Sequence, residues 1–284
     1  MTITDAPRQT SNPERHVPTR RVSFEESLRN VPKHFAADGD LIESHLAVCM
    51  SAVFPDGEDF FVRSVRHYRD RITDPALKRQ VAGFIGQESV HGREHRALND
   101  RFAELGYDTK RMERITKRGL ALRERIAPPM SNLASTAALE HFTATLAELL
   151  LSDQAVRDEF GDEAVQNVFL WHALEESEHK AVAFDVYMAV DGSYATRVRT
   201  YLVVSFMFST TTLATTYYLM FKDGTLWNAK NHRDLLYWLL VKPGLVRNVI
   251  PGWLDYLRPN FHPWDRDDRH LLDRWKREWA PAFR

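Results

Sequence analysis

The chain has 284 residues, 44% of them hydrophobic, so it is long enough to bury a sizeable core as one large domain or as one domain with an extension. Its 38 lysines and arginines nearly balance 39 aspartates and glutamates, which excludes an overall field that would recruit nucleic acid or an anionic bilayer. The single cysteine, Cys49, excludes an intrachain disulfide, a thiolate zinc site and an iron–sulfur cluster, and it fits a reducing cytoplasm.

The first 25 residues are polar and contain three prolines but no apolar core of a secretory signal. We expect residues 1–25 to form a disordered arm, residues 26–195 a helical bundle and residues 196–284 a helical extension. Glycine and proline are sparse, and the stretches between them carry apolar residues at i, i+3 and i+4, which predicts an all-α fold. The predicted helices cover about 40–53, 57–72, 75–105, 109–126, 131–152 and 162–190.

Residues 200–221 form an uncharged segment between Arg199 and Lys222 that is long enough to cross a bilayer of ~30 Å. Its serine and threonine hydroxyls suit helix packing better than bare lipid. We therefore expect a helix buried against the bundle. Contact with a membrane surface through 200–221 and a true span remain as alternatives.

The predicted 75–105 helix contains a glutamate and a histidine at ligand spacing. At 100° per residue, Glu88 and His91 lie about 60° apart and one turn along the axis, so both can reach one metal ion. This Glu-x-x-His pair is the one that di-iron bundles use on two of their four helices. Alone it is weak, because charged helices produce such pairs by chance.

The predicted 162–190 helix repeats the spacing with Glu176 and His179 and adds His172 one turn earlier. The three side chains lie within about 60° of one another and so share one stripe. The neighbouring residues are apolar, and a buried stripe of imidazole and carboxylate is costly unless a metal ion or a partner neutralises it. A salt-bridge network is the alternative interpretation.

A di-metal bundle needs one further carboxylate from each of the other two helices. Glu140 lies mid-helix among Ala, Leu and Phe and is favoured over Glu148, while the adjacent His141 points about 100° away and suits packing. For the first helix we favour Glu58, which precedes an aromatic-faced stretch, with Glu43 as the alternative.

Three further residues are candidates to support the ligands. Glu175 and Gln87 each precede a ligand glutamate and can hydrogen-bond a histidine, which fixes its tautomer. His95 lies within about 20° of the Glu88 and His91 stripe. We expect it to support a ligand or to pack in the core, with an extra ligand or a proton relay as the alternative.

With these residues in place, the sequence resembles the ferritin-like non-haem di-iron oxygenase superfamily over roughly residues 40–190. The His172-x-x-x-Glu176-x-x-His179 run looks like that of the arylamine N-oxygenases, which place a third histidine on one iron. The Phe-Pro-x-Gly-Glu, Gln-Glu-x-x-His and Leu-Glu-His-Phe-Thr strings look like a bacterial family labelled predicted metal-dependent hydrolases. Outside the ligand motifs the chain departs from the N-oxygenases, notably in segment 200–221.

The resemblance implies a ferritin-like four-helix bundle that binds two iron ions, with a mixed manganese–iron pair as an alternative. The expected function is oxygenation or oxidation of a small aromatic or alkyl substrate with O₂. Electrons would come from a separate reductase, since the chain shows no glycine fingerprint for a flavin or nicotinamide. The sequence leaves open whether the protein forms a homodimer. The rival functions are a di-metal hydrolase, an iron-binding protein and a membrane-associated scaffold, although no His-Glu-x-x-His zinc motif occurs.

Overall fold

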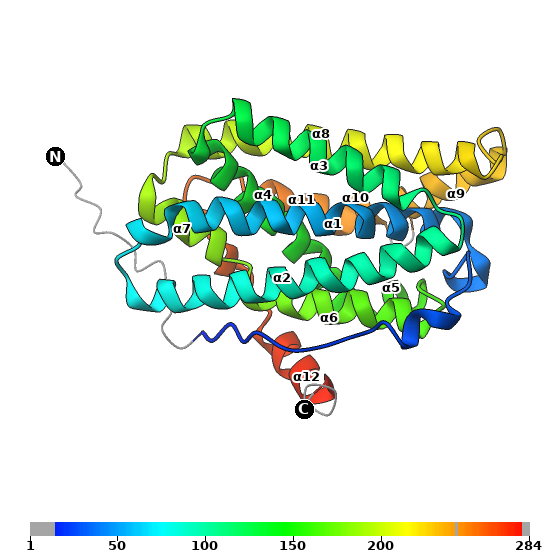
Figure 1. Ribbon diagram of the computed structural model, residues 1–284, viewed down its shortest axis with the longest axis horizontal. Helices are drawn as coiled ribbons and strands as arrows, with labels where there is room; N and C mark the ends of the chain where they lie inside the picture. Colours follow the sequence, from blue (N-terminus) through cyan, green and yellow to red (C-terminus); the bar gives the residue numbers. More distant parts are fainter. Residues whose placement is uncertain (1–14, 242–243, 280–284) are drawn as a thin grey trace.

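A computed structural model describes residues 15–241 and 244–279, and within these ranges all regular secondary structure is helical (Figure 1). The predicted all-α class is confirmed. The longer helices are α1 (Leu41–Tyr68), α2 (Pro75–Glu104), α3 (Thr109–Ile126), α4 (Pro129–Ser152), α6 (Glu163–His179) and α8 (Tyr194–Lys222). The shorter ones are α5 (Gln154–Asp158), α7 (Val182–Val190), α9 (Ala229–Leu240), α10 (Leu245–Asn248), α11 (Ile250–Asp255) and α12 (Arg269–Trp279). Short 3₁₀ helices occupy Ser27–Asn30, Ala37–Gly39, Arg69–Arg71 and Pro263–Asp265.

Helices α1, α2, α4 and α6 form the core of the molecule. Helix α1 packs against α2, α4 packs against α6, and contacts between α1 and α4 and between α2 and α6 close the group. The apolar core between them includes Phe60, Phe84 and Phe142, which are at most 1% exposed. Four long helices in mutual contact can direct side chains from four different elements to one interior point.

Short polar side chains fix where these helices begin. The Asp74 carboxylate accepts a hydrogen bond from the Ala76 amide, and Pro75 occupies the first helical position, where its missing N–H is not needed. Asp40 and Asp162 cap α1 and α6 in the same way. These capping bonds fix the first residues of α1, α2 and α6, the helices that carry most of the predicted ligands.

Helix α1 is continuous where the sequence predicts an end at Phe54-Pro55-Asp56-Gly57 and a second helix over 57–72. Pro55 has no N–H, so the carbonyl four residues earlier, that of Ser51, loses its helical donor. Asn99 Nδ2 of α2 donates to that carbonyl at 3.1 Å, and Arg96 Nη2 donates to the Pro55 carbonyl at 3.3 Å. Helix α2 thus supplies the hydrogen bonds that let α1 run through the proline.

The predicted 162–190 helix is interrupted after His179. Helix α6 ends there and α7 starts at Val182. The intervening Lys180 is buried, and its ammonium group contacts Asp268 at 2.8 Å and donates to the Arg266 carbonyl at 2.9 Å. The last ligand motif therefore ends next to a point where the C-terminal extension is anchored.

Residues 15–25, expected as part of a disordered arm, lie along α2 and α6 as the dark blue segment of Figure 1. Gly83 and Gly86 of α2 allow this approach, because a Cβ atom on either would clash with Val17 or Thr19. Residues 1–14 fall outside the described part of the chain.

The uncharged segment 200–221 lies within α8, which packs on α4 and α1. Tyr201, Val204 and Leu219 are buried against the bundle, whereas Phe206 and Phe221 are more than 60% exposed, so the predicted burial applies to one face only. No described helix combines the length and hydropathy that a bilayer span requires.

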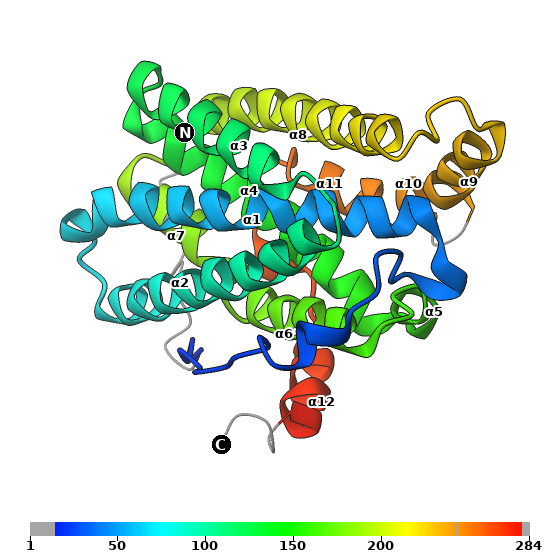
Figure 2. The ribbon, with the colours of Figure 1, turned by 45° about the vertical axis from the view of Figure 1, so that its right-hand side comes forward.

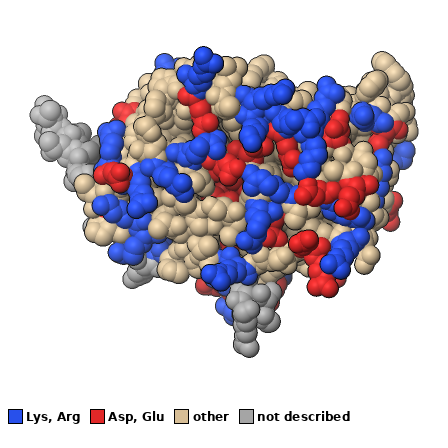
Figure 3. Space-filling view, viewed as in Figure 1, with Lys and Arg blue, Asp and Glu red and all other residues tan. Residues whose placement is uncertain are grey.

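The described part of the expected extension, residues 196–241 and 244–279, lies against the bundle. Helix α9 contacts α1, α11 contacts α4, and α12 contacts α6 and α4. Figure 2 shows α8, α9, α10 and α11 together on one side of the molecule, with α12 on another. Acidic and basic side chains are intermixed over the face in Figure 3, in keeping with the balanced charge.

Candidate metal centre

The side chains predicted as ligands come from four helices and meet inside the bundle. All of them are buried, and none is more than 4% exposed. They are Glu58 of α1, Glu88 and His91 of α2, Glu140 of α4, and His172, Glu176 and His179 of α6.

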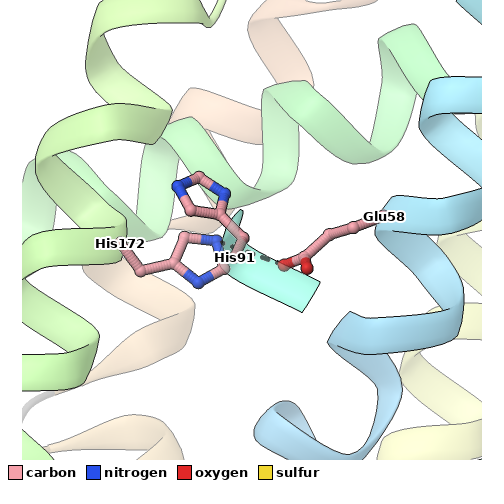
Figure 4. A group of neighbouring side chains, drawn as sticks. All are labelled: Glu58, His91 and His172. Carbon is pink, nitrogen blue, oxygen red and sulfur yellow. Dashed lines mark ion pairs between the residues drawn. The ribbon is translucent and has the colours of Figure 1, made fainter. Parts of the chain in front are cut away.

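One end of this cluster consists of Glu58, His91 and His172, each with a potential ligand atom within 4.8 Å of the others. His172 Nε2 lies 3.7 Å from Glu58 Oε1, and the His91 and His172 rings stack with centroids 4.2 Å apart. Figure 4 shows the Glu58 carboxylate directed toward the two imidazoles from the opposite helix.

The other end consists of Glu88, Glu176 and His179, joined by Glu140. His179 Nε2 lies 3.0 Å from Glu88 Oε1, 3.4 Å from Glu140 Oε2 and 3.5 Å from Glu176 Oε1. One imidazole nitrogen is therefore surrounded by carboxylates from three helices.

Glu176 and Glu88 lie between the two ends. Glu176 Oε1 is 3.0 Å from His172 Nε2 and 3.7 Å from His91 Nδ1, in addition to its approach to His179. Glu88 Oε1 approaches His91 Nδ1 at 3.9 Å as well as His179. Both carboxylates can thus contact ions held at either end, as bridging ligands do.

The outward nitrogen of each ligand histidine has a hydrogen-bond partner. His91 Nε2 bonds Glu175 Oε2 at 3.1 Å, and His179 Nδ1 bonds Gln87 Oε1 at 2.8 Å. Such outer bonds orient a metal-binding imidazole and select its tautomer. Glu175 and Gln87, the two residues expected to support the ligands, thus each hydrogen-bond one of the candidate ligand histidines.

The outer bond of His172 is made by His95, the third supporting residue predicted. His172 Nδ1 lies 2.6 Å from His95 Nε2, and the ring of Phe54 packs against both imidazoles. Because its Nδ1 bonds Ser51 Oγ at 2.9 Å, both ring nitrogens of His95 are engaged. His95 therefore takes the supporting position rather than that of an extra ligand.

A chain of hydrogen bonds fixes the direction of these contacts. Asn99 Nδ2 donates to the Ser51 carbonyl, so Asn99 Oδ1 accepts the only hydroxyl proton of Ser51, at 2.7 Å. Ser51 Oγ must then accept from His95 Nδ1–H. His95 Nε2 in turn accepts from His172 Nδ1–H, so His172 Nε2 is the nitrogen that faces the cluster.

The Gln87 amide fixes His179 by the same logic. Gln87 Nε2 donates to Glu178 Oε2 at 2.8 Å and to the Pro18 carbonyl at 2.9 Å, so Gln87 Oε1 accepts the proton on His179 Nδ1. Glu175 accepts from His91 Nε2–H. In all three histidines the outward nitrogen is thus engaged, and the nitrogen that faces the carboxylates is the one positioned to bind a cation.

Electrostatics favour cations at this point. Burial and repulsion from neighbouring carboxylates raise the pKa of Glu58 and of Glu140 well above the usual range, and burial raises the pKa of Glu88 to about 7. Burial would lower the pKa of His179, but its three carboxylate neighbours raise it well above the ordinary value. These raised pKa values mean that the cluster favours bound protons, because they neutralise its negative charge. A bound metal ion would neutralise the same charge.

The hydrogen-bond inventory leads to the same conclusion. Among the described residues, no hydrogen bond reaches either carboxylate oxygen of Glu58, Glu88 or Glu140. Burying such groups without partners costs free energy. The four ligand carboxylates, when ionised, carry a formal charge that two divalent cations would cancel, and their oxygen and imidazole donors suit iron or manganese. The residues present fit a pair of such ions.

Several supporting residues were not predicted. Arg20 Nη1 lies 2.9 Å from Glu175 Oε1 and 2.6 Å from Glu178 Oε2, and Lys276 Nζ lies 3.0 Å from Glu178 Oε1. Although burial alone would lower the pKa of Arg20, its bonds to the two carboxylates raise it. The partners of His91 and His179 are thus held by segments outside the four helices. The Thr143 hydroxyl, also unpredicted, donates to Glu176 Oε2.

The alternatives weighed for the remaining positions lie elsewhere. Glu43 is in the first turn of α1, away from the cluster, and Glu148 pairs with Arg266 at 2.7 Å. His141 turns from the cluster, bonds the Gly252 carbonyl at 2.8 Å and stacks on Tyr256, in agreement with its predicted packing role.

The fold and the site define a helical protein with two buried clusters that could hold metal ions. The sequence profile of a family described as "predicted metal-dependent hydrolase" matches residues 18–267. The chain belongs to this family. No curated protein and no solved structure matches the chain.

Proposed function

We propose that this protein is a non-haem di-iron oxidoreductase that uses O₂ to oxidise an apolar organic substrate. The observation that carries the proposal is the cluster itself, in which four carboxylates and three imidazoles from four helices converge. Each of its histidines has its outward nitrogen engaged in a hydrogen bond and directs its other nitrogen toward the carboxylates. This donor set is that of di-iron carboxylate bundles.

In this proposal Glu58, His91 and His172 would hold one ion, and Glu140 and His179 would hold the other. Glu88 and Glu176 would help to hold the pair, because each has an oxygen near histidines at both ends. The Thr143 hydroxyl donates to Glu176 Oε2, which leaves Oε1 as the oxygen that faces the imidazoles.

A pair of iron ions, when bound, would supply the redox chemistry that reduces O₂ in two-electron steps. Glu175, His95 and Gln87 orient the imidazoles so that each directs its inward nitrogen toward the carboxylates, and a bound ion would take the place of the proton that these carboxylates favour on His179. The buried Trp171 and the half-buried Phe54 pack against ligand histidines and limit the access of water. The electrons would come from a separate donor protein.

A metal-dependent hydrolase is the second candidate, favoured by the description of the family. Two metal ions can activate water as readily as they can O₂. The chemistry beside the centre favours oxidation, because the adjoining cavity is lined mainly by hydrocarbon side chains that suit an apolar substrate more than the polar bond of a hydrolysable one.

The test is the metal content of the purified protein together with its optical spectrum when the reduced form meets O₂. About two irons per chain and a transient absorption change would support the oxidoreductase. Zinc with no response to O₂, together with turnover of ester or amide substrates, would overturn it in favour of the hydrolase. Glu88→Ala or His179→Ala should lose most of the metal.

A further inference from the structure

A partly open cavity of about 470 Å³ adjoins the candidate centre. His172, Glu176 and Thr143 lie on its wall, so two candidate ligands face its interior. Helices α1, α4 and α6 form the bundle side, and α8, α9 and α11 form the opposite side. Figure 2 shows these extension helices grouped beside the bundle. The volume is within the ~300–1,000 Å³ typical of small-molecule sites.

The residues lining this cavity indicate what it would accept. Most are apolar, and among the described lining residues there is no lysine or arginine. The charged ones are carboxylates, namely Glu43, Glu159 and Glu176. A carboxylate or phosphate inside the cavity would meet like charge without a cationic partner, which is costly at low dielectric. An anionic ligand is therefore disfavoured.

A cationic ligand is disfavoured for a different reason. The polar groups next to the centre, His172 and Glu176, are already directed to each other and to their neighbours within the cluster. A buried ammonium group would lose its hydration, and the other two lining carboxylates, Glu43 and Glu159, already interact with other groups. Hydrocarbon atoms, by contrast, gain affinity from every methylene removed from water, by about fourfold each.

We propose that the cavity binds an uncharged hydrocarbon-rich molecule, such as a long-chain alkane or alcohol, with one end beside His172 and Glu176. This inference rests on the proposed function for the reaction, and it adds the substrate class. It assigns the extension helices a specific role, since α8, α9 and α11 supply the outer wall of the substrate site.

The experiment measures binding of 1-decanol, decanoate and decylammonium to the metal-free protein by intrinsic fluorescence. Trp238 and Trp253 line the cavity and report its occupancy. We expect 1-decanol to bind at least tenfold more tightly than either ion, and about fourfold more tightly per methylene along an alcohol series. Equal or tighter binding of decanoate or of decylammonium, or no dependence on chain length, would overturn the proposal.

Two adjacent positions on α8 provide a matched pair of variants. Thr212 lines the cavity, whereas Thr211 is exposed and is not part of the lining. Thr212→Phe should weaken 1-decanol binding at least tenfold, and Thr211→Phe should leave it unchanged. An equal effect of the two substitutions would place the ligand outside the cavity and overturn the proposal.

Metal uptake by the same proteins separates this inference from the proposed function. Thr212→Phe should still take up two ions, because it contacts no candidate ligand. Metal uptake without 1-decanol binding would overturn the substrate class alone. Selective 1-decanol binding without any iron uptake would overturn the di-iron function and retain the ligand class of the cavity.

Discussion

The substitution Glu140→Gln tests whether Glu140 is a metal ligand or only a structural carboxylate. The two roles predict different effects on stability when metal is added. Neither oxygen of Glu140 has a hydrogen bond in the described structure, and burial together with Glu176 and Glu88 raises its pKa. Without metal, the raised pKa keeps Glu140 uncharged, so an amide of nearly the same size and shape should change the stability little. With metal, it removes a ligand.

The magnitudes follow from these two effects. Exchanging one neutral buried group for another of nearly the same shape should change the stability by no more than about 1 kcal/mol, which in a chain of this size moves Tm in chelator by about 2–4 °C at most. Metal at a thousandfold excess over Kd stabilises the wild type by about 4 kcal/mol. A hundredfold loss of affinity reduces that to about 1.4 kcal/mol, so the increase in Tm caused by metal should fall to about one third.

The assay is thermal unfolding followed by circular dichroism, in chelator and in excess Fe²⁺ under anaerobic conditions. Glu148→Gln is the control on the same helix, since Glu148 pairs with Arg266 at the surface and such pairs contribute about 0–1 kcal/mol. It should leave the metal-dependent increase unchanged. If Glu140→Gln keeps the full increase with metal, the assignment of Glu140 as a ligand is wrong.

Three further predictions concern residues around the ligands. Arg20→Ala should weaken metal binding about 10–100-fold in a chelator competition, because Glu175 loses its guanidinium partner; unchanged affinity would contradict the outer network. Asn99→Ala should lower the free energy of unfolding by about 1–3 kcal/mol in urea titrations, because the Ser51 carbonyl and hydroxyl lose their partner; a neutral effect would contradict this account of α1. His141→Ala should destabilise the fold by about 2–5 kcal/mol but keep both ions, and loss of metal would show that α4 is misassigned.

The two Glu-x-x-His pairs could be predicted because the relation between their members depends on helix geometry alone. Glu88 with His91, and Glu176 with His179, share a face by virtue of the 3.6-residue turn, which no tertiary contact can alter. Glu58 required more, since Glu43 is also on the first helix and only the three-dimensional alignment of α1 with α2 distinguishes them.

The path of the chain through Pro55 could not be read locally. Proline removes one donor and usually ends a helix, and the following Asp-Gly favours a turn. The compensating donor comes from Asn99, 48 residues away from Ser51 along the chain. Because side-chain donors on a neighbouring helix leave no periodic signal in the sequence, local rules predicted two helices where there is one.

The amphipathic character of α8 was obscured by its composition. Segment 200–221 has no charge, so its buried and exposed faces carry similar residue types and no polar face marks the solvent side. Tyr201 is buried while Phe206 is exposed, and only the packing on α4 decides between them.

Residues 15–25 contribute side chains that support the candidate metal centre, although the composition of residues 1–25 suggested a disordered arm. Gly83 and Gly86 let residues 17–19 lie directly on α2, which carries Arg20 to two buried carboxylates. A chain without residues 15–25 would keep every ligand but leave Glu175 and Glu178 without that guanidinium, and truncating one partner of a buried pair costs about 3–5 kcal/mol. The family match starts at residue 18 and ends at 267, so it includes Arg20 and excludes the more exposed Lys276. The part of the chain that matches the family therefore contains the four helices and also residues 18–25. Arg20 and the Pro18 carbonyl in this segment bond Glu175 and Gln87, the outer partners of His91 and His179.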